Sequence, residues 1–286
     1  MSVISSSAAY LSSAIRDNSP EHESFKKFFD CWLSEQNQQL QDLIFTAKSF
    51  SSTPVDEAAL RSLIERVMNH YECYYRTKAT WSRHDVCAML TPSWLSSLED
   101  AFLWIGGWRP SMAFHLLYSK SGLQLEAPGK LDELIRSITT TTTTTTGQDL
   151  ADISPEQLSR VNELQRRTII EEKEISEEMA RCQETLAGPD MVELSDMVSE
   201  QLGTNNGSIV DDVGEEDRVE SALKPREKGL EEVLKRADEL RLKTLNDLVD
   251  LLTPIQAVHF LIAAAQLHLK IHEWGKKRDA KHHLAA

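Results

Sequence analysis

Apolar side chains recur at intervals of three and four residues along most of this chain, and that spacing places them on one face of an α-helix. The first two runs extend from Phe25 to Leu40 and from Leu60 to Tyr75. The alternation of apolar and polar residues that marks a half-buried strand does not extend over a comparable length. The sequence therefore predicts an all-α fold, a helical bundle with long C-terminal helices and two flexible loops.

Signals at helix ends predict where the later helices lie. Proline is favoured in the first turn of a helix, and glycine is favoured at the residue after a helix ends. Ser154 and Thr253 are good N-caps, and each precedes a proline. These signals predict helices at 91–106, from 110 onward, 154–186, 230–252 and 254–275. Because 16 of the 19 aromatic residues lie between Phe25 and Tyr118, that part should hold the densest core.

Three segments lack the helical rhythm. Residues 1–24 are rich in serine and predict a disordered tail, and 119–153 contains eight consecutive threonines that predict a solvated loop. Residues 188–220 carry an acidic run and predict a second flexible insertion. The rest predicts one helical domain over 25–280, with 281–286 as the end of a basic tail.

Charge and cysteine content exclude several classes of protein. The 45 acidic and 31 basic residues give a formal charge of −14, which disfavours unaided binding to a phosphate backbone. The four cysteines are far apart and form no CxxC pair, so neither a disulfide framework nor a structural zinc site is expected. No apolar run is long enough for a membrane span, and the sequence fits a reducing compartment, the cytosol or nucleus.

Sequence signatures of the common enzyme classes are missing, among them the P-loop, the dinucleotide fingerprint, the nucleophile elbow and HExxH. A glycine pair does occur in a conspicuous motif, formed by Trp104, Gly106, Gly107, Arg109 and Pro110. It lacks the frame of a phosphate loop, so it predicts a corner between two helices with the glycines at positive φ. The alternative is that Arg109, where a helix opens, contacts an anion.

The last predicted helix carries two histidines one turn apart. Its polar stripe, which should face water, contains His259, Gln266, Lys270 and Glu273. His268 and His272 lie on the opposite side, in line with Leu261, Ala264 and Ala265. Two readings stay open, core histidines with satisfied hydrogen bonds or a ligand site.

Haem is the ligand that best fits this pair, because a site made of metal alone needs a third ligand that the sequence does not reveal. Haem needs one strong axial donor and a flat apolar slot, which the small side chains of Ala264 and Ala265 would leave open. Side chains at i and i+4 point the same way, so we expect one axial histidine of the iron from His268 and His272, or a site shared between chains.

The segment from Lys276 to His283 is the one concentrated basic patch in the sequence. It fits equally well the favourable placement of cations at a helix C-terminus and a role in nuclear import or phosphate contact.

The same residues resemble a known plant family. The segment Ser97–Ser111, with its Leu-Trp-Ile-Gly-Gly-Trp-Arg-Pro core, is similar to the Delay-of-Germination domain, which also forms the C-terminal region of TGA bZIP transcription factors. Similar stretches are Ala237–Leu245, Leu252–Ala257 and Leu267–Gly275. The resemblance covers roughly 22–280, and its final His268-Leu-Lys-Ile-His272 is closer to the stand-alone dormancy proteins than to TGA factors.

This resemblance implies a nuclear protein of transcription control, with type 2C protein phosphatases of the abscisic-acid pathway or bZIP/TGA factors as partners. It also implies haem at His268 and His272, or a fatty acyl chain in the core as the alternative. TGA factors carry a basic region and zipper ahead of the domain, whereas 1–24 holds one arginine and no heptads, so zipper-type DNA reading does not transfer.

Three hypotheses follow. The first is a non-enzymatic regulatory protein of seed dormancy, abscisic-acid signalling or transcription control, which acts through protein partners and is modulated by haem. The second is a DNA-associated regulator that binds DNA directly or with a bZIP partner. The third, a metal-dependent enzyme that uses the histidine pair, has the least support. The sequence leaves homo-oligomerisation open.

Overall fold

The computed structural model describes residues 21–50, 57–122, 150, 152–203 and 212–285, and within these ranges every regular element is helical. The predicted all-α fold is confirmed. Residues 1–20 of the predicted tail and 123–149 of the predicted loop lie outside the described residues, so the two predictions are not tested there. They are wrong at the described edges, because residues 21–24 belong to a helix that begins at Glu21 and residues 119–121 to a helix that ends at Ser121.

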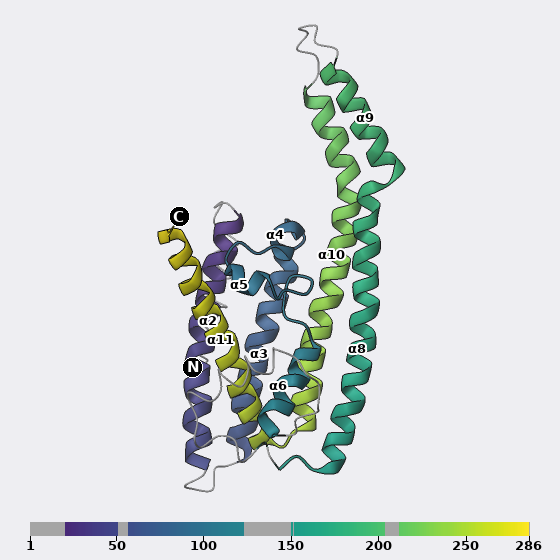
Figure 1. Cartoon of the computed structure of the whole chain (residues 1–286). Coiled ribbons are helices and arrows are strands. Elements are labelled where there is room, and N and C mark those ends of the chain that lie inside the picture. Colours follow the sequence, from purple (N-terminus) through teal and green to yellow (C-terminus); the bar gives the residue numbers. More distant parts are fainter. Residues whose placement is uncertain (1–20, 51–56, 123–149, 151, 204–211, 286) are drawn as a thin grey trace.

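The chain runs through long helices joined by short ones (Figure 1). In order these are α2 (Glu21–Phe50), α3 (Glu57–Trp81), α4 (Val86–Leu90), α5 (Ser97–Asp100), α6 (Ser111–Ser121), α8 (Pro155–Glu184), the 3₁₀ turn η1 (Thr185–Ala187), α9 (Pro189–Gly203), α10 (Asp212–Leu251) and α11 (Pro254–Ala285).

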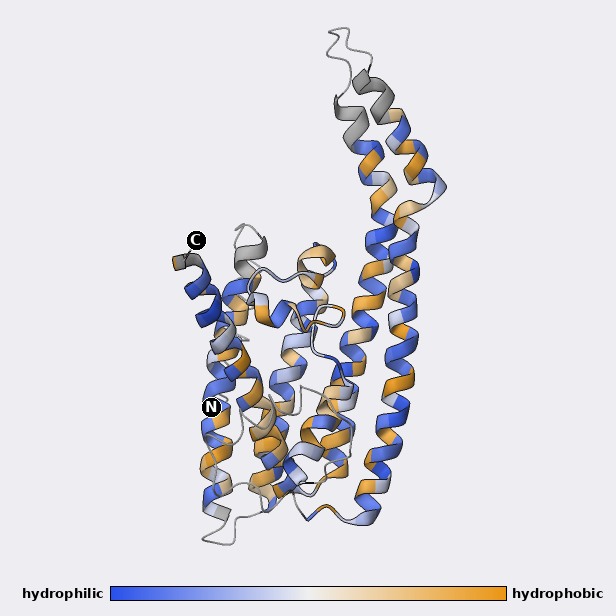
Figure 2. Ribbon diagram, viewed as in Figure 1, coloured by the Kyte–Doolittle hydropathy of each residue, from blue (hydrophilic) through white to orange (hydrophobic). Residues whose placement is uncertain are grey.

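The helices α2, α3, α6 and α11 form a bundle, and the pair α8 and α10 packs along its side. Apolar residues concentrate where the bundle helices face one another, as Figure 2 shows. At one end the core is aromatic, with Phe25, Phe29, Trp32 and Trp94 all at most 2% exposed. The predicted aromatic core is therefore confirmed.

Two helix starts follow the predicted signals. Ser154 caps α8 with a reciprocal pair of hydrogen bonds to Gln157, and Pro155 occupies the first turn. Thr253 and Gln256 form the same arrangement at the start of α11. Such capping boxes satisfy backbone N–H groups that a helix start leaves without partners.

The predicted helix at 91–106 is wrong. The chain instead forms the short helices α4 and α5 and then a tight turn. The side chain of Asp85 caps α4, and Ser96 with Glu99 builds a new capping box for α5. Two strong caps eleven residues apart therefore divide the segment. Pro110 is the N-cap of α6, as the sequence predicts.

The predicted flexible insertion at 188–220 is also wrong for its described part. Residues 189–203 form α9, and α10 already begins at Asp212. Leu194 is buried, and α9 packs on α10. Arg226 of α10 donates to the Thr185 carbonyl at 2.9 Å and to Asp190 at 2.8 Å, which fixes the junction between α8 and α9.

The last helix does not end at Gly275 as predicted but continues to Ala285. Gly275 serves a close contact instead, since an added Cβ would lie only 1.9 Å from Oγ of Ser96. Glycine here lets α11 approach the start of α5, and this approach brings His272 beside Glu99.

Candidate functional site

The glycine motif forms a tight turn between α5 and α6. Trp104 and Gly107 exchange backbone hydrogen bonds, and the two residues between them have positive φ, +46° at Ile105 and +66° at Gly106. That is the backbone of a type I′ turn, which glycine adopts freely and a β-branched residue adopts with strain. The prediction of positive φ is confirmed for Gly106 but wrong for Gly107, and the other positive φ of the turn is at Ile105.

Two buried cations bind the carbonyl groups of this turn. Arg241 of α10 donates to the carbonyls of Trp104, Ile105 (2.8 Å) and Trp108 (2.7 Å), and Lys78 of α3 donates to that of Gly106 at 2.7 Å. Asp238 accepts from both Arg241 and Lys78. We call this group the corner network: Lys78, Asp238, Arg241 and the carbonyls of 104–108.

Gly107 has a separate role in the corner network. A Cβ on Gly107 would lie 2.8 Å from Cζ of Arg241, so only glycine leaves room for the guanidinium. Burial lowers the pKa of Lys78 to about 8 against the opposing effect of Asp238, so the lysine stays mainly charged at neutral pH.

The other motif residues attach the corner to the neighbouring helices. Trp104 donates from Nε1 to Ser176 of α8 at 3.0 Å, and Trp108 donates to the hydroxyl of Tyr75 of α3 at 2.7 Å. Arg109 pairs with Glu172 of α8 at 2.8 Å, and the other oxygen of this fully buried carboxylate accepts from the backbone N–H of Ser111, next to Pro110. The structure thus supports the structural reading of the motif, with Arg109 held by a carboxylate of its own chain.

His268 and His272 lie on the bundle side of α11, as predicted, and both Nδ1 atoms have partners. Nδ1 of His268 donates to the side-chain oxygen of Gln36 of α2 at 2.9 Å, and Gln36 donates in turn to the hydroxyl of Tyr71. Burial lowers the pKa of His268 to about 4, because water no longer stabilises the charged form.

His272 makes a hydrogen bond with a carboxylate. Its Nδ1 lies 2.9 Å from Oε1 of Glu99 on α5, and Oε2 of Glu99 accepts from the N–H and O–H of Ser96. Burial raises the pKa of Glu99, but the hydrogen bonds from His272 and Ser96 together outweigh it and lower the pKa. His272 therefore ties α11 to the cap of α5.

A third histidine, which the sequence did not single out, belongs to the same region. His70 of α3 stacks on Trp32 with ring centroids 4.6 Å apart, and its Nδ1 lies 3.8 Å from Glu35. Burial lowers the pKa of His70 to about 4, while Glu35 opposes the shift. Among the described residues, its buried Nε2 has no hydrogen-bond partner.

The histidine pair offers a ligand atom for haem iron, but no flat space for the porphyrin lies beside it. With Nδ1 engaged, Nε2 of each imidazole is the nitrogen left for iron, an arrangement common in metal-bound histidines. The ring of Trp32 lies 5.7 Å from that of His268, and Phe29 lies 5.8 Å from His272. Ala265 is buried in the core with Ala264 packed against it, so these side chains do not leave the flat space predicted there. In this conformation the residues do not fit a porphyrin, and we derive no step through it.

The predicted polar stripe is correct at one end of α11 only. Lys270 is exposed and pairs with Glu273, but His259 is 4% exposed and lies in the interior. Near its start α11 is surrounded by other bundle helices on all sides, so position on the helical wheel does not decide exposure there.

The basic patch is partly used within the chain. Lys276 donates to the carbonyl of Trp94 at 2.7 Å, Lys277 pairs with Glu273, and Asp279 accepts from Ser97. The contacts of Lys276 and Asp279 hold α11 to α5 and to the residues just before it, whereas the pair of Lys277 and Glu273 lies within α11. In the described part of the chain, three or more His, Cys, Asp or Glu side chains are nowhere grouped as a metal site. The described helices include none that could cross a membrane.

Arg241, Lys78 and Glu172 are the residues that the sequence reading missed. The sequence indicates such residues only as charges on the otherwise apolar face of a helix. Glu172 is an example, since it lies among the buried apolar residues of α8. A single interruption does not reveal its partner, because Arg241 and the turn are more than 130 residues apart.

The fold and the contacts of the corner network and the histidine pair define an all-α domain whose buried charged groups hold its helices together. The chain belongs to the DOG1 family: the family model for seed dormancy control matches residues 37–119, and the DOG1-like 3 protein of Arabidopsis thaliana is 32% identical over 87% of this chain and 82% of its own length.

Two further relatives from Arabidopsis thaliana widen the comparison. The protein RESPONSE TO ABA AND SALT 1 is 24% identical over 91% of this chain and 99% of its own length. Transcription factor TGA2 is 27% identical over 81% of this chain but only 57% of its own length. The chain thus shares its domain with a longer transcription factor.

Replacement of Arg241 by methionine should lower the free energy of unfolding by about 3–5 kcal/mol, because it leaves three turn carbonyls without their donor and Asp238 with Lys78 alone. Urea denaturation followed by circular dichroism measures the change. Arg236→Met is the control on the same helix, since its ion pair with Glu178 is 45% exposed on the arginine side and should contribute less than about 1 kcal/mol. Equal losses in the two variants would contradict the role of the corner network.

Stability should fall as the pH drops from about 6.5 towards 4. In the folded chain the pKa values of His70 and His268 are about 4, below their ordinary 6.5, so the unfolded chain binds more protons in this window. The free energy of unfolding, measured at pH 7 and pH 5, should decrease, and His268→Gln should reduce the decrease. An unchanged pH dependence in that variant would exclude His268 as a source.

Proposed function

We propose that this chain is a non-enzymatic regulatory protein of seed dormancy and abscisic-acid signalling that acts in the nucleus through protein partners. The observation that carries the proposal is the match of nearly the whole chain to DOG1-like proteins and to the RESPONSE TO ABA AND SALT 1 protein. The partners proposed are type 2C protein phosphatases and bZIP factors of the TGA type.

The match to TGA2 supports the link to transcription and a nuclear location. It covers most of this chain but little more than half of that transcription factor, which is the pattern of a shared domain with different neighbours. The buried groups of that domain support a binding role, since Arg241, Lys78, Glu172 and Glu99 all have partners within the chain.

Purified proteins test the proposal. The intact chain should bind a type 2C phosphatase or a TGA-type bZIP factor with a dissociation constant of about 10 µM or tighter in calorimetry, and binding to the phosphatase should change its rate on a phosphopeptide. The Arg236→Met variant serves as a folded control that should bind equally. Failure of both partner classes to bind would overturn the proposal.

A DNA-associated role is the second candidate, and the exposed cations Arg278 and Lys281 at the end of α11 favour it. A gel shift separates the two. We expect no shift by the chain alone, because its charge is −14, and a shift only with a TGA-type factor present. A shift by the chain alone that weakens steeply with salt would favour the second candidate.

Haem modulation remains a separate prediction. Hemin added to the purified chain should give a Soret band only if Phe29 and Trp32 move away from the pair, and the band should weaken in His272→Ala or His268→Ala. His115→Ala is the matched control, as His115 is exposed on α6 and not part of the cluster around Trp32. A band unchanged in both pair variants would exclude His268 and His272 as ligands.

A further inference from the structure

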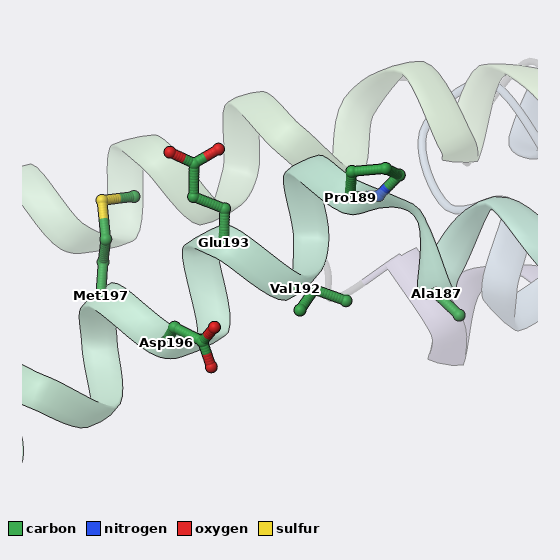
Figure 3. A pocket seen from close by; sticks show the side chains of 6 residues that line it. All are labelled: Ala187, Pro189, Val192, Glu193, Asp196 and Met197. Atoms are coloured by element: carbon green, nitrogen blue, oxygen red, sulfur yellow. The ribbon is translucent and has the colours of Figure 1, made fainter.

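Beyond the bundle, the molecule extends into an arm formed by α9, η1 and the first half of α10 (Figure 1). α9 packs on α10 and η1, and α8 and α10 connect it to the bundle. The arm carries an open pocket of about 530 Å³, lined by Ala187, Pro189, Val192, Glu193, Asp196 and Met197. Figure 3 shows these side chains along η1 and the first turns of α9.

The arm exposes large apolar side chains next to acidic ones. Leu186 is 61% exposed, Val192 51% and Met197 42%. In Figure 3, Glu193 and Met197 point to one edge of the α9 face that lines the pocket, and Val192 and Asp196 point to its other edge. Clustered exposed apolar residues with a polar rim are typical of a protein-binding surface.

The charged side chains of η1 and α9, which line the pocket, are acidic. Residues 182–203 contain five acidic and no basic side chains. Arg226 of α10 neutralises Asp190, but among the described residues no ion pair engages Glu193 or Asp196. A partner that covers the pocket must therefore bring apolar groups and positive charge together.

We propose that the groove of η1 and α9 binds a basic amphipathic helix of a partner protein. The apolar stripe of that helix would cover Leu186, Val192 and Met197, and its lysines or arginines would face Glu193 and Asp196. The inference rests on the proposed function, because it names the chemistry of a partner for a protein that acts through partners.

The charges favour this occupant over a second copy of the chain. A second copy would place another η1 and α9, again with Glu193 and Asp196 and without a basic residue of their own, against the first. The basic end of α11 in a second copy is a weaker candidate, because Lys276 and Lys277 are already held by Trp94 and Glu273 of their own chain.

The probe is a labelled synthetic helix of about 18 leucine and lysine residues with one apolar stripe, titrated into the full chain by fluorescence anisotropy. The controls are a peptide of the same composition with the stripe scrambled and a leucine and glutamate helix. The amphipathic basic peptide should bind, and both controls should bind about tenfold or more weakly.

Variants locate the site. Val192→Ser with Met197→Ser, and Glu193→Lys with Asp196→Lys, should each weaken binding about tenfold or more. Matched controls on α8 are Ile169→Ser with Ile170→Ser, also exposed apolar residues, and Glu156→Lys with Glu163→Lys, which change the charge equally. These controls should change affinity less than about twofold.

Three outcomes overturn the proposal. The first is no binding of the basic helix, and the second is an equal loss of affinity in the groove and control variants. The third is a molecular mass in sedimentation that rises with protein concentration and falls in the groove variants, because that would assign the groove to a second copy. Groove variants that still bind a phosphatase or a TGA-type factor as wild type does would leave the proposed function intact, so the two failures are distinguishable.

Discussion

The guanidinium of Arg241 is fully buried, and the structure around the corner depends on how it is satisfied. A buried cation is costly unless its donors find acceptors. Here the acceptors are Asp238 and the carbonyls of a turn that is itself strained at Ile105. Because the turn carbonyls converge on Arg241 and Lys78, the turn, α3 and α10 fix one another, and Gly107 leaves the space that this requires.

The histidine pair on α11 likewise places buried polar groups in hydrogen bonds. His268 and His272 connect α11 to α2 and α5 through Gln36 and Glu99, and Gly275 permits the close approach that these bonds need. The polar groups of both clusters are therefore consumed in holding helices together. A role for the bundle interior in binding would require these contacts to open first.

Helix type and several helix starts could be predicted from the sequence because periodicity and capping act within a few residues. Gly275 was misread as a helix end, and the proline at 92 as the start of a helix over 91–106, for the same reason. Both are local signals, whereas the structure uses Gly275 for a contact with Ser96. The side of α11 that carries His268 and His272 was predicted correctly, but Gln36 and Glu99 were not, since they lie 232 and 173 residues away. No local signal encodes such pairings.

The negative charge of the chain is concentrated in one part of the structure. Acidic residues dominate the arm, away from the buried pairs of the bundle, while the basic end of α11 is fastened to α5. α8 and α10 run without interruption from the arm to Glu172 and Arg241 at the corner. A partner on α9 would therefore be connected to the bundle through two paired helices. These two helices relate the position of a bound partner to the bundle. A conformational switch would require a second arrangement of the corner network.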